Sequence, residues 1–330
     1  MASNTLYPMK FYPLFKHKIW GGSKIHDFFG IDYSPLPNCG ELWALSGLKG
    51  NESIISNGFL ADNNLNEVLE IYLDEILGEG VYARYGIFFP LLFKWIDAND
   101  NLSVQVHPDD ILAHKRGLGM GKTEMWYIVQ SDKDAKLISG FNRKISRVEY
   151  ANRLRDKKLV EVLNSETVSP GDVFFIPAGR VHSIGKGILL AEIQQSSDTT
   201  YRIYDWDRTD SEGKTRRLHI AEAMDAIDFT PIECCAKTHY HGLLNHTVNL
   251  VNQPEFTTQL IHISDGLTKD YETLDSFVVY MCVEGHGEVH TDNTLESLSA
   301  GECMLLPATI NKATLIPHGE MKVLETFILT

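Results

Sequence analysis

The sequence contains few cysteines, and they follow no pattern. Among 330 residues there are five, Cys39, Cys234, Cys235, Cys282 and Cys303, and none of them forms a C-x-x-C motif. An odd and scattered set argues against a disulfide framework and fits reduced thiols in a cytoplasm.

Long apolar runs and a secretory leader are also missing. No apolar run reaches the roughly 18 residues that a membrane-spanning helix needs. The first residues, MASNTLYPMKFYPLF, lack the basic-then-apolar layout of a signal peptide. We therefore expect a cytoplasmic protein that has no membrane partner.

The chain has no surplus of positive charge. Its 30 lysines and arginines are outnumbered by 44 aspartates and glutamates, which gives a net charge of −14. This balance argues against a nucleic-acid partner, and it means that an anionic substrate requires a locally positive pocket. The 43% hydrophobic and 22% charged content is ordinary for a globular protein of this length, with two domains expected.

Helical periodicity is confined to a few stretches. Apolar residues recur at helical spacing at about 64–82, where Gly78 and Gly80 end the pattern, and again at about 146–163, where Ser146 and Glu149 predict a capping box. A short helix is also expected at 218–227. Most of the remaining chain has strand character, and Lys94 interrupts one apolar strand as either an edge residue or a group in a polar cavity.

A candidate metal site begins in the segment SVQVHP. Gln105 and His107 are two residues apart and share one face of a strand that Pro108 ends. Glu124 opens the next strand, and His182 follows a strand and a turn. Two imidazoles and one carboxylate are the ligand set of a catalytic zinc with an open position, to which Gln105 can add a weak neutral oxygen. A second histidine group, His239, His241 and His246, lacks a carboxylate at useful spacing.

An internal repeat indicates the architecture. The segment SPGDVFFIPA at 169–178 matches SAGECMLLPA at 299–308 by residue class. The pattern resembles the cupin family of double-sheet jelly rolls. The resemblance implies a mainly β protein with two cupin-type jelly-roll barrels and a few accessory helices.

The two copies differ where ligands are expected. At a constant offset, His182 of the first copy aligns with Lys312 of the second, and the strand that corresponds to Glu124–Tyr127 begins without a carboxylate. We expect a metal-containing catalytic domain at 1–235, which includes both helical insertions, and a degenerate domain without metal ligands at 240–330.

Four motifs give a closer resemblance, and it extends over nearly the whole chain. They are GELW at 40–43, QVHP at 105–108, GKTEMWY at 121–127 and QQSSDTTYR at 194–202. Together they resemble the type I mannose-6-phosphate isomerases, in their short bacterial form. The resemblance implies interconversion of mannose 6-phosphate and fructose 6-phosphate by proton transfer between C2 and C1 through an enediol. It also places one zinc ion on Gln105, His107, Glu124 and His182, and the family's active-site arginine on Arg202.

Nearby cations suit that chemistry. Arg202 carries a planar, permanently charged fork that can hold a phosphate or an enediolate. Lys122 lies two residues before Glu124 and is expected to reach the pocket. The competing interpretations are an ion pair of Arg202 with Asp205 or Asp207, and a solvated loop lysine at position 122.

The sequence leaves several roles open. The proton carrier can be Asp198, Lys122 or a water on the zinc, and Asp198 can instead support Arg202. Glu41 can accept a bond from a sugar hydroxyl or from a ligand residue. A cupin that only binds metal or sugar, and another metal-dependent cupin enzyme such as an iron dioxygenase, are the alternative functions. The sequence gives no oligomeric state.

Overall fold

The computed structural model describes residues 5–209, 212–232 and 235–330. It is mainly β, and its described residues divide into two compact units. The first unit comprises the described parts of Met1–Leu14, Trp43–Lys94 and His239–Thr330, and the second comprises those of Phe15–Leu42 and Trp95–Thr238. Residues 5–14 and 43–94 therefore cluster with the C-terminal segment, whereas the sequence assigned them to the first domain. The domain division at 1–235 and 240–330 stays a prediction.

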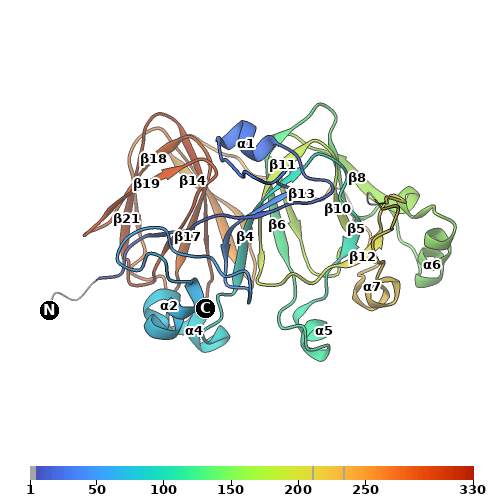
Figure 1. The fold of residues 1–330 in the computed structure, drawn as a ribbon, viewed down its shortest axis with the longest axis horizontal. Helices are drawn as coiled ribbons and strands as arrows, with labels where there is room; N and C mark the ends of the chain where they lie inside the picture. Colours follow the sequence, from blue (N-terminus) through green and yellow to red (C-terminus); the bar gives the residue numbers. More distant parts are fainter. Residues whose placement is uncertain (1–4, 210–211, 233–234) are drawn as a thin grey trace. The chain divides into compact units, whose positions relative to one another are not determined.

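The first unit holds two antiparallel sheets (Figure 1). The six-stranded sheet has the order β1 (Met9–Lys10), β20 (Cys303–Leu306), β17 (Val278–Glu284), β22 (Met321–Phe327), β15 (Thr257–Ile263) and β14 (His246–Asn252). The four-stranded sheet has the order β16 (Leu267–Asp270), β21 (Lys312–Pro317), β18 (His286–His290) and β19 (Leu295–Ser299). One apolar core takes residues from both sheets, for example Val323 from the first and Leu315 from the second. This is the layout of a double-sheet jelly roll.

The second unit is built in the same way. A five-stranded sheet has the order β12 (Tyr201–Tyr204), β5 (Val104–Val106), β10 (His182–Ile184), β7 (Lys136–Phe141) and β8 (Leu163–Thr167). A seven-stranded sheet has the order β13 (Lys237–Thr238), β9 (Val173–Ile176), β6 (Glu124–Ser131), β11 (Ile188–Gln195), β4 (Leu91–Ala98), β3 (Glu41–Ser46) and β2 (Leu14–Lys16), and the unit boundaries fall within β2, β3 and β4. The predicted jelly-roll class is confirmed. In the described residues, each pair of sheets forms two separate ladders and no closed cylinder.

Helices cover the outer face of the five-stranded sheet. They are α6 (Arg147–Arg155), the 3₁₀ turn η1 (Leu159–Val162) and α7 (Ile220–Ala226). Their apolar residues join Val104 and Val106 in one core cluster. Because Val104 and Val106 point outward into this cluster, Gln105 between them points inward, as strand alternation requires.

The predicted helix at 64–82 consists of three short helices, α2 (Leu65–Tyr72), α3 (Asp74–Leu77) and α4 (Glu79–Tyr85). Leu73 and Gly78 separate them with φ values of 46° and 90°, which no helix residue adopts. Asn64 and Glu67 form a capping box at the start of α2. The predicted helix at 146–163 likewise breaks at Lys157, whose φ is 56°. Two further helices, α1 (Lys24–Phe29) and α5 (Asp110–Lys115), were not predicted.

The two copies of the repeat can be compared through their strand registers. Ile176 pairs with Glu124 in one unit, and Leu306 pairs with Val278 in the other, so an apolar valine stands at the position of the carboxylate. The alignment of His182 with Lys312 is wrong in one respect. Lys312 is exposed and Ala313 is buried, so the inward position belongs to Ala313. No helix in the described chain has the length and apolar character to cross a membrane.

A buried carboxylate anchors α1. Asp97 has no exposed surface, and its Oδ2 accepts the backbone N–H of Lys24 at 2.6 Å. Its Oδ1 has no hydrogen-bond partner among the described residues. Burial, only partly offset by the Lys24 N–H, raises the pKa of Asp97 from 3.8 to about 6.

This shift predicts a pH dependence of stability. Between pH 6 and pH 4 the folded protein holds a proton on Asp97 that the unfolded chain has lost, so this carboxyl adds stability as the pH falls through about 6. Relative to an Asp97→Asn variant, the free energy of unfolding of the wild type should rise by about 2 kcal/mol from pH 7 to pH 4.5. Urea unfolding at several pH values measures the difference, and parallel curves for the two proteins would contradict the assignment.

Candidate metal centre

Strand pairing brings three predicted residues into one row. In the antiparallel ladders of the five-stranded sheet, Gln105 is directly opposite His182 on one side and Arg202 on the other. Directly opposed residues project to the same face of a sheet. Because Gln105 points inward, His182 and Arg202 also face the interior of the jelly roll.

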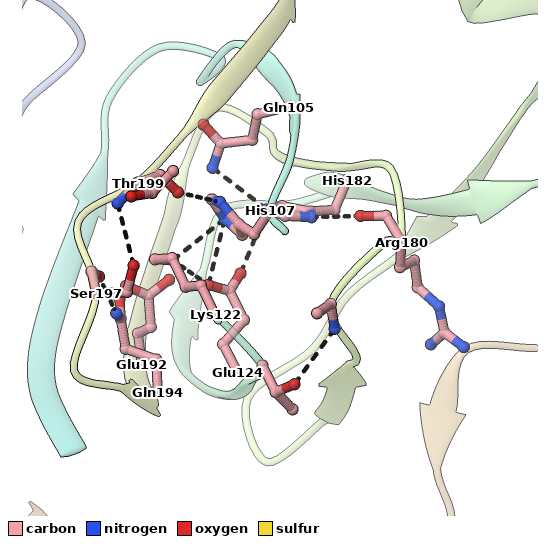
Figure 2. Close-up of polar contacts among 12 residues, drawn as sticks. Gln105, His107, Lys122, Glu124, Arg180, His182, Glu192, Gln194, Ser197 and Thr199 are labelled. Carbon is pink, nitrogen blue, oxygen red and sulfur yellow. Dashed lines mark hydrogen bonds and ion pairs between the residues drawn. The ribbon is translucent and has the colours of Figure 1, made fainter. Parts of the chain in front are cut away.

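The predicted ligands form one buried cluster (Figure 2). Glu124 Oε2 lies 3.5 Å from His107 Nε2, and Glu124 Oε1 lies 3.3 Å from His182 Nε2. The three side chains are at most 1% exposed, and their ligand atoms all lie within 4.8 Å of one another. Within the part of the chain that the structure describes, this is the one such group of three. His239, His241 and His246 form no comparable group there.

Backbone carbonyls fix both imidazoles. His107 Nδ1 lies 2.8 Å from the Thr199 carbonyl oxygen, and His182 Nδ1 lies 2.8 Å from that of Arg180. A carbonyl oxygen only accepts, so each Nδ1 carries the proton and each Nε2 presents its lone pair to the cluster. Burial, together with the charge of Lys122, lowers the pKa of His182 to about 3, although the hydrogen bond to the Arg180 carbonyl acts in the opposite direction. This ring is therefore neutral at physiological pH.

A lysine contacts the same donor atoms. The Lys122 ammonium donates to Glu124 Oε2 and lies 3.2 Å from His107 Nε2, and its residue is only 4% exposed. The interpretation as a solvated loop lysine is therefore wrong. A cation is held by the carboxylate and an imidazole lone pair, which is the electrostatic behaviour that a metal site requires. The donor set and its outer hydrogen bonds thus fit a divalent metal ion.

Gln105 meets the cluster with its amide nitrogen. Gln105 Nε2 lies 3.3 Å from His182 Nε2 and donates to it, since that nitrogen carries no proton. As a metal ligand, Gln105 would have to present its carbonyl oxygen, which a rotation of the amide provides.

Arg202 is half-buried beside this row. Its Nη1 donates to the Arg217 carbonyl oxygen at 2.9 Å, and its buried Nε has no hydrogen-bond partner among the described residues. Asp205 pairs with Arg216, and Asp207 pairs with Lys157. The predicted alternative, an ion pair of Arg202 with either aspartate, is therefore not formed in the described structure. Burial, together with the charge of Arg216, lowers the pKa of Arg202.

Asp198 and Glu41 lie outside the cluster of ligand atoms. Asp198 is exposed on the segment between β11 and β12, and no hydrogen bond or ion pair joins it to Arg202 in the described structure. Glu41 begins β3, and its Oε1 pairs with Lys18 Nζ at 3.0 Å.

Two buried charged residues in strands of the seven-stranded sheet were given no functional role from the sequence. Glu192 in β11 is 5% exposed, and its Oε1 accepts the Trp126 indole N–H at 3.1 Å. Figure 2 shows it beside Gln194 and near the ligand residues. The sequence signal for Glu192 was a lone carboxylate within the apolar run ILLAEIQQ.

Lys94 is 6% exposed, with its Nζ 5.1 Å from the ring centre of Trp43, so the interpretation of Lys94 as an edge residue fails.

Comparisons with known proteins agree on one family. The family described as "Phosphomannose isomerase type I, catalytic domain" matches residues 9–135. The chain is 35% identical over 320 residues to mannose-6-phosphate isomerase ManA of Bacillus subtilis (strain 168), covering 96% of this chain and 98% of the relative. It is 37% identical over 299 residues to mannose-6-phosphate isomerase of Streptococcus mutans, covering 89% and 90%. A crystal structure of mannose 6-phosphate isomerase from Bacillus subtilis superposes with a TM-score of 0.82 at 30% identity, covering 97% and 99%.

The cluster predicts how metal content depends on His182. A His182→Ala variant removes one of two imidazole donors and should lose at least about 10-fold in metal affinity. Metal analysis after dialysis against a weak chelator measures the loss. His290→Ala, which removes a histidine in the other unit, is the matched control and should keep the wild-type metal content. Equal metal in the wild type and His182→Ala would contradict the assignment.

Proposed function

We propose roles for individual residues on one premise: the chain belongs to the type I mannose-6-phosphate isomerase family. It is an aldose–ketose isomerase, and its reaction interconverts mannose 6-phosphate and fructose 6-phosphate. The observation that carries the residue assignment is the buried cluster of His107, Glu124 and His182, in which both imidazoles present Nε2. The finer assignments, which are the metal, the proton carrier and the phosphate contact, are our inferences.

We assign zinc to this cluster. Two neutral imidazoles and one carboxylate are a common set for catalytic zinc, and Gln105 is the fourth candidate ligand. When bound, zinc supplies a positive charge that polarises the sugar oxygens. The Thr199 and Arg180 carbonyls hold the rings of His107 and His182, so neither ring has to turn in order to bind the metal.

Arg202 and Lys122 supply the remaining positive charge. The reaction moves a proton between C2 and C1, and an oxygen becomes partly anionic on the way. Arg202 faces the same interior as Gln105 and has a buried N–H without a partner, so it can donate to an enediolate or a phosphate oxygen. These two cations make a locally positive pocket in a chain whose net charge is −14.

For the proton carrier we favour Lys122 over Asp198. Lys122 contacts two ligand residues in a site from which water is largely excluded, whereas Asp198 is exposed. A proton held in a buried site is delivered to substrate and not lost to solvent. We place Asp198 and Glu41 as candidate contacts for sugar hydroxyls.

The four cysteines that the structure describes are free thiols, which supports the predicted cytoplasmic location. Cys234 lies outside the described residues.

Turnover and metal identity test the proposal together. Purified protein loaded with zinc should convert mannose 6-phosphate to fructose 6-phosphate in a coupled assay, and chelation should abolish the conversion until zinc is restored. A zinc-loaded protein that binds the sugar without turnover would favour a non-catalytic cupin. Iron in the isolated protein, with oxygen consumed, would favour an oxygenase.

Arg202→Ala should separate chemistry from metal binding. Because Arg202 contacts none of the three ligand residues in the described structure, the variant should keep its metal while kcat falls about 100- to 1,000-fold. Arg202→Lys keeps the charge without the planar fork and should fall between the wild type and Arg202→Ala. The control is Arg155→Ala, an exposed arginine on α6, which should behave like the wild type. A fully active Arg202→Ala would remove Arg202 from the mechanism.

A further inference from the structure

A buried glutamine joins three segments beside the ligand cluster. Gln195 ends β11 and is 2% exposed. Its Oε1 accepts the backbone N–H of Thr123 at 2.9 Å, and its Nε2 donates to Asp110 at 3.0 Å to Oδ1 and 3.2 Å to Oδ2. Its own backbone N–H donates to the Thr123 carbonyl at 3.0 Å. The side chain therefore uses its acceptor and its donor on two different segments.

Asp110 completes the connection from the other side. It is the first residue of α5, next to the N-cap Asp109, and its Oδ1 also accepts the backbone N–H of Gly121 at 2.7 Å. Gln195 and Asp110 thus hold the backbone at Gly121 and at Thr123. Lys122 is the residue between these two points, and its own N–H donates to the Pro108 carbonyl at 3.1 Å.

The chain before Lys122 contains three glycines in two different surroundings. Gly117 and Gly119 have φ values of 67° and 81° and no atom near the place of a side chain. Gly121 is different, because a Cβ there would lie 2.6 Å from the Asp110 backbone nitrogen. The chain therefore has open space beside Gly117 and Gly119 and packs closely against α5 at Gly121. The hydrogen bonds to Asp110 and Gln195 begin at this closely packed residue, Gly121.

We propose that Gln195 and Asp110 form a positioning pair that holds the backbone of Lys122 and so places its ammonium beside the ligand cluster. The inference rests on the role of Lys122 proposed above. Neither residue of the pair contacts the ligand atoms directly, so the pair acts on the rate through Lys122 and leaves the metal ligands in place. Displacing a catalytic group by about 1 Å can reduce a rate about 100-fold.

The chemistry of the pair allows a swap experiment. Gln195→Glu places a carboxylate against Asp110, where a donor is needed, and the two should repel. Adding Asp110→Asn restores the donor on the opposite side. The new carboxylate then accepts from Thr123 and from the new amide, and the amide oxygen accepts from Gly121. All three hydrogen bonds exist again, and only the bond between residues 195 and 110 has its donor and acceptor exchanged.

We expect Gln195→Glu to lower kcat by about 100-fold while KM changes by less than about 3-fold and zinc stays stoichiometric. The double variant should recover to within about 5-fold of the wild type. Asp109→Asn is the matched control, because asparagine caps a helix as well as aspartate does, and it should keep wild-type kcat. Asp110→Ala, at an exposed residue that should not prevent folding, is expected to lose about 10-fold.

Several outcomes would overturn the proposed role of Gln195 and Asp110. They are wild-type kcat in both Gln195→Glu and Asp110→Ala, or a double variant as slow as the slower single variant. In a Lys122→Met background, Gln195→Glu should change the residual kcat by less than about 2-fold, and a further 100-fold loss would show that the pair does not act through Lys122. An inactive zinc-loaded wild type would instead overturn the proposed function, and the pair with it.

Discussion

A carboxylate without exposed surface, Glu124, sets the electrostatic requirement on which the site depends. A buried negative charge is retained only where nearby charges and hydrogen bonds compensate it. Here the neutral rings of His107 and His182 face it with lone pairs, so they cannot supply the compensating charge themselves. A cation is needed, and in the structure it is the ammonium of Lys122. The metal preference of the cluster and the placement of Lys122 both follow from this need.

The other unit meets the same requirement without metal ligands. Glu325 in β22 is directly opposite Tyr280, as Glu192 is opposite Trp126, and it is fully buried. Lys269 pairs with its Oε2 at 2.7 Å, and the Tyr271 hydroxyl donates to its Oε1. A partly buried lysine thus neutralises the carboxylate, and apolar Val278 stands at the position that corresponds to Glu124. The repeated fold keeps a buried acid in both copies, and among the described residues a pair of imidazoles accompanies a buried carboxylate in one of them.

Strand alternation predicted the direction of Gln105, whereas the place of Arg202 in the same row was implied by the family resemblance. Gln105 alternates with Val104 and Val106 in β5, and the strand registers place it opposite His182 and Arg202, whereas His107 lies just beyond the end of this strand. The glycine at position 78 was recognised as a stop, but the break at Leu73 was not predictable, because its positive φ depends on tertiary packing and not on its own preference. The alignment of the two repeats at a constant offset also failed at Lys312, since a shift of one residue reverses which side chains of a strand face inward. Glu192 was missed because a single acid in an apolar strand has no partner that the sequence identifies.

Trp126 contacts both the buried acid Glu192 and the candidate ligand His182. Its indole N–H is bound by Glu192, and its ring meets the ring of His182 edge-on, with centres 5.4 Å apart. Indole emission responds to the electric field along the ring. A change of charge on the neighbouring imidazole therefore alters the light that this residue emits. Trp126, one of five tryptophans in the chain, is thus an intrinsic fluorophore in contact with a histidine of the candidate metal cluster.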